Sequence, residues 1–387
     1  MDSQAVELVR TSFKAVAAQT DGPDRLARSF YSILFTSQPH LRDLFPAVML
    51  SQRDRLVKAI AYVVERLDEP ERLLPFLRQL GADHRKCGVR DVHYVAVGDA
   101  LVAALRGFAV NELWTDAVDD AWTDALDLIA DTMRAGAAGV TGASVWAGTV
   151  IEHERVLRDV AVIRLELDVP MHYDACQYVS VQIPQRPRMW RFMSPANPAN
   201  DEGVIEFHIR AIAGGWVSQA MVGSTDIGDR WQFGSPMGEL GLRADRTRDL
   251  LMVASGTGIA PLRAQLMEMA QRRDNPRVHL FVCGHHPCDL YDLDLLSELA
   301  ALNPWLTLTP VSEVDENPWW FTEPHDRSSP AMANRITGQI GKVVASLGPW
   351  ADRDVQIVGP PPMVQTTKFR LMASGVPSAN MRHDPLF

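Results

Sequence analysis

The sequence predicts three domains in series: an all-helical domain, then a small antiparallel β-barrel, then an α/β domain with a parallel sheet. Three observations predict this order. Apolar residues repeat at helical spacing as far as residue 133 and alternate with a period of two from residue 161; after residue 249, short apolar runs alternate with helical patterns. The predicted domains are residues 1–140, 141–245 and 246–387, which suits a typical domain size of roughly 150 residues.

The composition argues against several classes of partner. The net charge of −10 over 387 residues disfavours nucleic acid and anionic membrane surfaces as main partners. The longest charge-free stretch, Ala135–Ile151, is too short and too weakly apolar to cross a bilayer, and the N-terminus shows no secretory signal. We therefore expect a cytoplasmic protein, a monomer or a weak dimer, without an integral membrane segment. Its four cysteines show neither CxxC pairs nor metal-ligand spacing, so reduced thiols are expected.

The first domain is predicted to be helical throughout. Apolar residues keep helical spacing in five segments, near residues 6–16, 26–34, 56–67, 95–105 and 122–133. This pattern suits either a helical bundle or a globin. The segment Ser29–Pro46 favours the globin, because it resembles the second helix and following corner of bacterial globins at Phe30-Tyr31, Leu34-Phe35, Pro39 and Leu44-Phe45.

The resemblance to globins extends to the residues around their haem. Phe45 matches the corner phenylalanine against the haem, Gln52 and Leu56 match residues of the distal helix, and His84 matches the proximal iron ligand. A neutral imidazole ligates iron, and the Tyr31 hydroxyl and the Gln52 amide can donate to iron-bound dioxygen. Taken singly, His84 is a surface histidine among 11 and Tyr31 is a core tyrosine. The intervals between these residues favour a haem b site.

One position departs from the pattern of flavohaemoglobins, the globins that carry a flavin reductase. In that family the proximal histidine is polarised by a tyrosine and a glutamate. Tyr94 stands at the tyrosine position, but Ala137 occupies the place of the glutamate. Without that carboxylate, the imidazole is expected to donate less electron density to the iron. The departure resembles the divergent, type II class of actinobacterial flavohaemoglobins.

The second domain follows a stretch rich in Gly, Ala, Ser and Thr, Gly136–Gly148, which is predicted to be a linker. Alternation over residues 161–167, 178–183 and 204–209, with turns between them, predicts a small antiparallel barrel. Three segments resemble the flavin domain of the ferredoxin-reductase family: Cys176-Gln177-Tyr178, Arg191-Phe192-Met193-Ser194 and Gly214-Gly215-Trp216-Val217-Ser218. The resemblance implies bound FAD, with Arg191 and the backbone amides after Gly215 beside its pyrophosphate.

Two features of the barrel leave alternatives open. Arg186, Arg188 and Arg191 with Trp190 also suit an RNA-stacking strand, although the acidic net charge disfavours that interpretation. Met193 stands where the family's tyrosine packs on the isoalloxazine. We therefore expect an altered FAD pose, with Tyr178 or Trp190 as the substitute platform.

The third domain is anchored by the stretch Asp249–Met267. Its apolar run Leu250–Ala254 predicts a strand buried on both faces, followed by a glycine-containing turn into a helix. Such a turn presents backbone N–H groups and the positive helix end to an anion, although ordinary strand-to-helix turns share the pattern. Further strands are predicted at residues 278–283, 307–311 and 355–358, in a parallel sheet with helices on both faces.

Two segments of this domain resemble the nicotinamide site of the ferredoxin-reductase family. The first is its glycine-rich loop, here Gly256, Thr257, Gly258, Ile259, Ala260 and Pro261. The second is its Cys-Gly-Pro strand end, here Val358, Gly359 and Pro360, with Val358 in place of the cysteine.

The choice between NADH and NADPH is predicted from the loop after the second strand. Residues 284–295 carry Asp289, Asp292 and Asp294 but no arginine or lysine, so a 2′-phosphate would meet acid there and NADH is favoured. His285 and His286 offer contacts to such a phosphate, although an exposed histidine pair in a loop gives the same pattern.

Two further segments carry open interpretations. Glu313–Arg335, with Trp319-Trp320-Phe321, is expected to be a long loop, which serves either as a lid or as simple packing. Phe387 falls where the family places an aromatic ring over the flavin, and a frayed chain end is the alternative.

The order of these resemblances is that of flavohaemoglobins and covers nearly the whole chain. It implies an oxidoreductase in which FAD passes electrons from NAD(P)H, with NADH favoured, to haem-bound dioxygen. Its catalytic haem site would contain Tyr31, Gln52, His84 and Tyr94, and dioxygenation of nitric oxide to nitrate is the usual family outcome. The replaced positions Ala137, Met193 and Val358 leave two alternatives: an oxidoreductase with a small organic donor such as D-lactate, and a haem-based redox or gas sensor.

Overall fold

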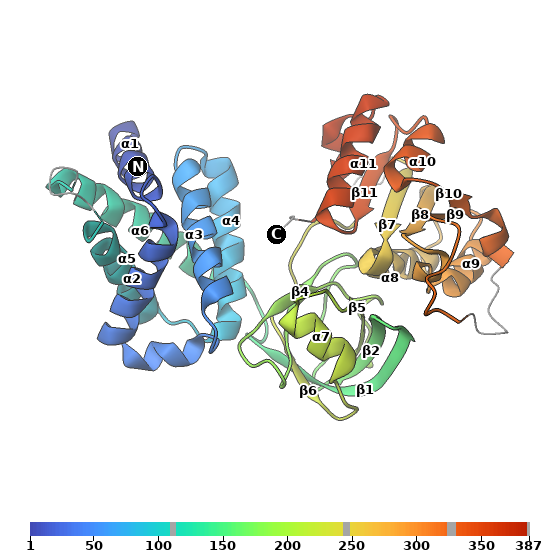
Figure 1. The fold of residues 1–387 in the computed structure, drawn as a ribbon, viewed down its shortest axis with the longest axis horizontal. Helices are drawn as coiled ribbons and strands as arrows, with labels where there is room; N and C mark the ends of the chain where they lie inside the picture. Colours follow the sequence, from blue (N-terminus) through green and yellow to red (C-terminus); the bar gives the residue numbers. More distant parts are fainter. Residues whose placement is uncertain (109–113, 243–247, 323–329, 385–387) are drawn as a thin grey trace. The chain divides into compact units, whose positions relative to one another are not determined.

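The computed structural model describes residues 1–108, 114–242, 248–322 and 330–384. The chain divides into two compact units (Figure 1). One unit comprises residues 1–145 and 187–189, and the other comprises residues 146–186 and 190–387. No helix within the described ranges has the length and apolar character needed to cross a membrane.

The first unit is helical, as predicted. Its elements are α1 (Ser3–Ala17), α2 (Gly22–Ser37), η1 (Pro39–Leu44), α3 (Leu50–Glu65), α4 (Pro70–His84), η2 (Arg85–Cys87), α5 (Asp91–Arg106) and α6 (Asp116–Ala138). Asp2 and Thr115 cap α1 and α6, because each side chain accepts a hydrogen bond from a backbone N–H of the first turn. Trp122 is buried in the core, where its Nε1 donates to Ser12 Oγ at 2.9 Å.

Helix α4 is absent from the five segments predicted by periodicity. Leu73 and Leu77 are fully buried, but Pro70 and Pro75 and the charged residues around them obscure the helical pattern. Pro70 lies in the first turn, where its missing N–H costs nothing. The missed helix is the one that ends at His84.

The predicted linker Gly136–Gly148 is wrong at both ends. Helix α6 continues to Ala138, and strand β1 begins at Trp146. A Cβ atom on Gly136 would lie 2.1 Å from the Arg78 carbonyl oxygen, and one on Gly81 would lie 2.0 Å from the Met133 carbonyl oxygen. The small residues therefore let α4 and α6 pack backbone against backbone, which is a packing role and not flexibility.

The barrel domain contains β1 (Trp146–Leu157), β2 (Val160–Leu167), β3 (Val179–Gln182), β4 (Arg191–Met193), β5 (Val204–Arg210), α7 (Trp216–Gly223) and β6 (Arg230–Phe233). The strand order is β4-β3-β6-β1-β2-β5, and each neighbouring pair is antiparallel, in a nearly closed barrel. The predicted alternation places Phe207 of β5 inside, where its ring stacks on that of Phe233 of β6 with centroids 5.9 Å apart.

The α/β domain lies in the same unit as the barrel. Its parallel sheet has the order β10-β9-β8-β7-β11-β12, formed by β7 (Leu250–Ser255), β8 (Val278–Gly284), β9 (Leu306–Ser312), β10 (Ile336–Thr337), β11 (Asp354–Val358) and β12 (Met381–Arg382). Met252 and Ala254 pack with α8 (Ile259–Ala270) and α9 (Leu293–Leu302). Leu251 and Val253 pack on the other face with α10 (Ile340–Ser346) and α11 (Pro361–Ala373) (Figure 1). Both faces of β7 are therefore buried, as predicted.

Candidate cofactor sites

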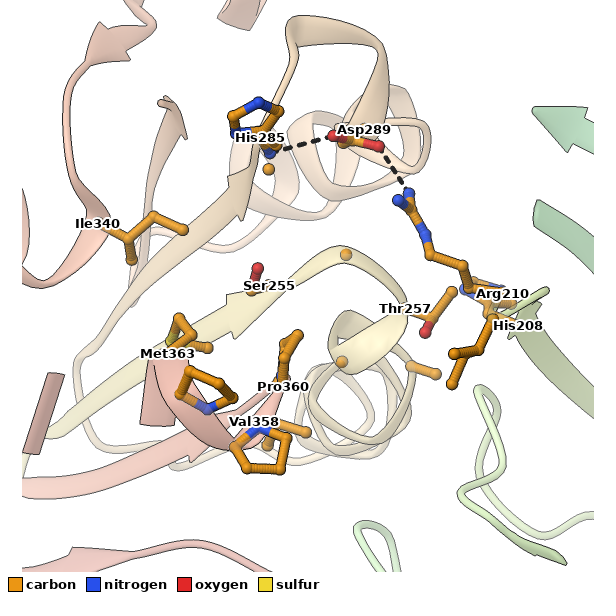
Figure 2. Close-up of a pocket in the computed structure, with 18 of the residues that line it drawn as sticks. His208, Arg210, Ser255, Thr257, His285, Asp289, Ile340, Val358, Pro360 and Met363 are labelled. Atoms are coloured by element: carbon orange, nitrogen blue, oxygen red, sulfur yellow. Dashed lines mark hydrogen bonds and ion pairs between the residues drawn. The ribbon is translucent and has the colours of Figure 1, made fainter. Parts of the chain in front are cut away.

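A pocket of about 1150 Å³ lies between the barrel and the C-terminal ends of the parallel strands (Figure 2). The barrel contributes β4, the end of β5 and the start of α7, and the α/β domain contributes the loops after β7, β8, β9 and β11. This edge of a parallel sheet is where nucleotides bind in α/β domains. The volume is above the range of roughly 300–1,000 Å³ that is common for small-molecule sites.

The glycine-rich loop after β7 forms one wall of the pocket. Gly256 has a φ of +55°, which favours glycine, and a Cβ atom on Gly258 would lie 2.6 Å from the Val358 carbonyl oxygen. Seven of the predicted nicotinamide residues line the pocket: Gly256, Thr257, Gly258, Ala260, Pro261, Gly359 and Pro360. Ile259 does not line it and is buried beneath the loop, only 1% exposed. The loop fits a diphosphate, because its turn leaves backbone N–H groups available near the start of α8.

The predicted flavin residues form the opposite wall. Those that line the pocket are Arg191, Phe192, Met193, Ser194, Gly215, Val217 and Ser218. Gly215 is the N-cap of α7, whose first turn has N–H groups without helical partners, and the Arg191 side chain lines the same wall. These groups fit the pyrophosphate of FAD. Trp216 and Tyr178, which the sequence predicts to contact the cofactor, are not part of the lining.

The aromatic residues near Met193 are not equally accessible. Tyr178 is only 6% exposed and packs edge-on against Phe192, with ring centroids 5.1 Å apart. Phe192 is 45% exposed and lines the pocket. Phe192 is thus the ring of this pair that a flavin can reach without a rearrangement of Tyr178.

A buried polar cluster joins the barrel to the α/β domain. Glu206, His208 and Arg210 alternate along β5 and point to one side. His208 Nδ1 lies 2.9 Å from the Tyr291 hydroxyl. Arg210 Nη2 donates to Asp289 Oδ1 at 2.6 Å, as Figure 2 shows. Sequence reasoning missed this cluster, although charged residues at alternate positions of an otherwise apolar strand were a usable signal.

Glu206 is the centre of that cluster. It accepts hydrogen bonds from Arg164 and Arg263, and its Oε1 lies 2.9 Å from His208 Nε2. Burial disfavours the charged carboxylate, but the hydrogen bond with His208 and the Arg263 charge outweigh it and hold the pKa of Glu206 well below its usual value. The carboxylate therefore stays ionised and ties α8, which follows the glycine-rich loop, to the barrel.

Of the three aspartates predicted to face a 2′-phosphate, only one lines the pocket. Asp289 lines the pocket, but its carboxylate is engaged by Arg210 and by the backbone N–H groups of His285 and His286. Asp292 is buried, which raises its pKa, and lies 3.4 Å from Arg263 Nε; Asp294 is outside the lining. The prediction that these aspartates face a 2′-phosphate is therefore wrong for Asp292 and Asp294. Sequence reasoning overlooked Glu313 at the end of β9, which lines the pocket with its Oε2 2.8 Å from His285 Nδ1.

The helical unit brings His84 to the end of α4. Its Nδ1 lies 2.7 Å from the Leu80 carbonyl oxygen, so Nδ1 carries the proton and Nε2 is the bare nitrogen. Burial lowers the pKa of His84, so the imidazole is neutral near neutral pH. No group of three His, Cys, Asp or Glu side chains suited to a metal occurs in the described parts of the chain. A single neutral imidazole fits a haem iron, whose other ligands are porphyrin nitrogens.

The predicted distal residues also lie together. Tyr31 is 6% exposed, and the Gln52 side chain lies near enough to its hydroxyl to lower its pKa slightly against the effect of burial. Burial raises the pKa of Tyr31 to about 12, so the hydroxyl keeps its proton. Its ring lies 5.4 Å from that of Phe45, and Phe45 and Leu56 pack against the same core. A neutral hydroxyl and an amide among apolar side chains fit the distal side of a haem.

Tyr94 has a cationic neighbour. The Arg134 guanidinium lies 5.2 Å above the centre of its ring, and burial raises the pKa of Tyr94. Ala137 lies on the same helix as Arg134 and supplies no carboxylate. Tyr94 therefore has the Arg134 cation over its ring, and no carboxylate reaches it from position 137.

Asp384 was not singled out from the sequence. Its carboxylate would lie 3.7 Å from a Cβ atom on Gly238, at a point where the Tyr178 ring is also close. It forms no ion pair in the part of the chain that the structure describes, and burial raises its pKa to about 6. The neighbouring Phe387 lies outside the described residues.

Asp384 is expected to make stability pH-dependent. The unfolded chain releases this proton near the ordinary pKa of a carboxyl, whereas the folded chain retains it to about pH 6. The ionised residue therefore destabilises the fold above its folded pKa and has no effect well below its unfolded pKa. Asp384→Asn should stabilise the second unit by about 1–2 kcal/mol above the folded pKa, after allowance for partial exposure. Thermal unfolding at the two pH extremes measures this, and an equal gain at both extremes would contradict it.

Comparison with known proteins assigns each domain to a family. The family described as Globin matches residues 28–133. Oxidoreductase FAD-binding domain matches residues 147–241, and Oxidoreductase NAD-binding domain matches residues 252–368. These matches confirm the predicted fold classes and the predicted cofactors haem, FAD and a nicotinamide dinucleotide.

Relatives and solved structures cover either part or all of the chain. The reductase component of phenol 2-monooxygenase from Pseudomonas sp. strain CF600 is 27% identical over 54% of this chain, and the chain covers only 56% of that relative's length. A flavohemoprotein from Bordetella parapertussis is 28% identical over 70% of this chain and 72% of its own length. The structure of a flavohemoglobin from Malassezia yamatoensis, with bound FAD and heme, superposes with a TM-score of 0.79 over 100% of this chain and 99% of its own, at 16% identity.

Proposed function

We propose that this chain, which belongs to the flavohaemoglobin family, oxidises nitric oxide to nitrate with dioxygen and with electrons that pass from NADH through FAD to haem. When bound, FAD accepts two electrons from NADH and the haem supplies them singly, so that each nitric oxide combines with one dioxygen and one electron to give one nitrate. The proposal rests on one combination of features. The globin domain contains an unprotonated imidazole nitrogen at His84 and a neutral hydroxyl at Tyr31 near Gln52, and the same chain has a flavin–nicotinamide pocket.

His84 and its helix hold the proximal side. The bond from Nδ1 to the Leu80 carbonyl fixes both the tautomer and the ring orientation, so Nε2 would be the nitrogen that ligates a haem iron. A backbone carbonyl is a weaker acceptor than a carboxylate, so His84 stays less anionic than a carboxylate-bound imidazole. With Arg134 beside Tyr94 and alanine at 137, this supports placing the chain in the divergent class of the family.

Tyr31 and Gln52 hold the distal side. Because the Tyr31 hydroxyl keeps its proton, it can donate a hydrogen bond to a ligand on the distal side of the haem, and the Gln52 amide can donate a second. Phe45 and Leu56, which pack against the same core, would limit the access of water to these donors. This arrangement favours a diatomic gas that takes on negative charge.

The arrangement of the second unit supports NADH as the donor. Glu313 places a carboxylate at the pocket beside His285, where a 2′-phosphate would be repelled and a ribose hydroxyl could donate. The cofactors and the acidic composition suit a cytoplasmic site of action, where NADH is available.

The test is aerobic turnover with purified, haem- and FAD-loaded protein. With NADH and nitric oxide, we expect nitrate to form in proportion to the nitric oxide consumed, at two nitrates for each NADH oxidised. NADH oxidation that proceeds without nitrate formation would contradict the proposal.

Tyr31→Phe is expected to weaken retention of dioxygen. The variant loses one hydrogen-bond donor to a charged acceptor, worth about 1.5–3 kcal/mol, so dioxygen should dissociate roughly 10- to 100-fold faster. Carbon monoxide carries less charge on its outer atom and should be affected much less. Flash photolysis measures both ligands; an equal effect on both would show that Tyr31 acts by size and not by donation.

A further inference from the structure

Three arginines line the flavin–nicotinamide pocket, and they differ in their partners. Arg191 is on the flavin wall, where its Nη1 donates to the Trp190 carbonyl oxygen at 2.8 Å. Arg210 is neutralised by Asp289 at 2.6 Å. The Arg370 side chain forms no ion pair or hydrogen bond within residues 1–108, 114–242, 248–322 and 330–384, and its Nε is buried without a partner.

Arg370 lies on α11 at its packing contact with α10. A Cβ atom on Gly341 would lie 3.2 Å from Arg370 Cδ and 3.2 Å from Thr367 Cα, so glycine leaves the space through which the arginine stem passes. Gln339, Ile340, Gly341 and Thr366 line the same end of the pocket. Figure 2 shows Ile340 across the pocket from the Arg210–Asp289 pair.

A partly buried guanidinium without a counter-charge destabilises the fold, because the cation loses water without gaining an anionic partner. A ligand that supplies the negative charge removes this penalty. The pocket is the one that the proposed function assigns to the nicotinamide dinucleotide, whose phosphates are its anionic groups. Helix α10 has seven residues and is too short to supply an anion site by itself, so the charge at this end comes from the side chain. The Thr366 hydroxyl can add a neutral donor.

We propose that Arg370 binds a phosphate group of the nicotinamide dinucleotide at the α10–α11 end of the pocket. The inference rests on the proposed function, because it takes the dinucleotide as the occupant. Two phosphates share this chemistry: the bridging diphosphate, which NADH carries and which the proposed function therefore expects, and the 2′-phosphate, which only NADPH carries. A guanidinium binds either through paired N–H donors, which a lysine cannot reproduce in full.

The experiment is calorimetric titration of the haem- and FAD-loaded protein with ADP, 2′-AMP and adenosine. We expect Arg370→Gln to weaken either ADP or 2′-AMP by about 10- to 100-fold and to leave adenosine unchanged. Arg370→Lys should recover part of the loss. Lys342→Met removes an exposed cation of α10 that is not part of the lining and should leave all three affinities unchanged.

The outcomes separate the possibilities. A loss confined to 2′-AMP identifies the 2′-phosphate, whereas a loss for ADP identifies the bridging diphosphate. Unchanged affinity for both in Arg370→Gln and Arg370→Lys, or equal losses for adenosine, overturns the inference. The titration requires no electron transfer, so failure of NADH to reduce the flavin would reject the proposed function independently of this result.

Discussion

His84→Ala is expected to yield a protein that has lost the haem Soret band and kept the flavin absorbance. In the proposed haem site, His84 Nε2 is the protein ligand to the iron, and its Nδ1 is fixed by the Leu80 carbonyl. Alanine removes the metal–ligand bond and leaves a haem held by apolar contacts alone. Haem affinity should fall by at least about 100-fold, because even an outer partner of a metal ligand costs 10- to 100-fold. Absorbance spectra after gel filtration measure the haem-to-protein ratio.

Two controls separate ligand loss from misfolding. His40→Ala removes an exposed histidine from η1 of the same domain and should keep the Soret band. Imidazole added to a His84→Gly variant should restore part of the band, because the free base can occupy the vacated position. A His84→Ala protein that binds haem as well as the unmodified chain would contradict the assignment of the ligand.

Gly258→Ala is expected to slow reduction of the flavin by NADH by about 100-fold or more, since a displacement near 1 Å at a reacting site has effects of this size. The added Cβ would meet the Val358 carbonyl oxygen at 2.6 Å and the Gly359 nitrogen at 3.1 Å. Both neighbours are backbone atoms, so no side-chain rotation relieves the clash, and the loop must move away from β11. Overpacking of this kind also costs about 1–3 kcal/mol of stability. Anaerobic flavin bleaching after mixing with NADH measures the rate.

The matched control is Gly223→Ala at the end of α7. A Cβ atom there would meet nothing within 4 Å, and this glycine is not among those with positive φ. It should leave flavin reduction unchanged. If Gly258→Ala reduced its flavin as fast as Gly223→Ala, the glycine-rich loop would not hold the nicotinamide cofactor.

Much of the fold follows from local pattern. The change from helical to two-residue periodicity correctly separates the helical domain from the barrel, and the apolar run at residues 250–254 predicts a strand buried on both faces. Helix α4 was missed because Pro70 and Pro75 weaken the periodic signal, although tertiary packing of Leu73 and Leu77 stabilises the helix. The small residues at 136–138 were part of the predicted linker, but in the structure they belong to α6, where Gly136 allows close packing with α4.

The site divides in the same way. The resemblance to globins predicts Gln52 and His84 on opposite sides of a haem. The loop at Gly256–Gly258 predicts a phosphate site from one short segment. The pairing of Asp289 with Arg210 depends on the approach of two domains, so the sequence could not show that this carboxylate is already engaged. Arg370 was missed because its place in the pocket depends on a tertiary contact within the α/β domain, between α10 and α11.

The most direct test of the proposed electron path is anaerobic stopped-flow of the haem- and FAD-loaded protein after mixing with NADH. We expect flavin absorbance to bleach first and haem reduction to follow, and we expect His84→Ala to retain the first phase and lack the second. Haem reduction that precedes flavin bleaching, or a flavin that NADH leaves oxidised, would contradict this path.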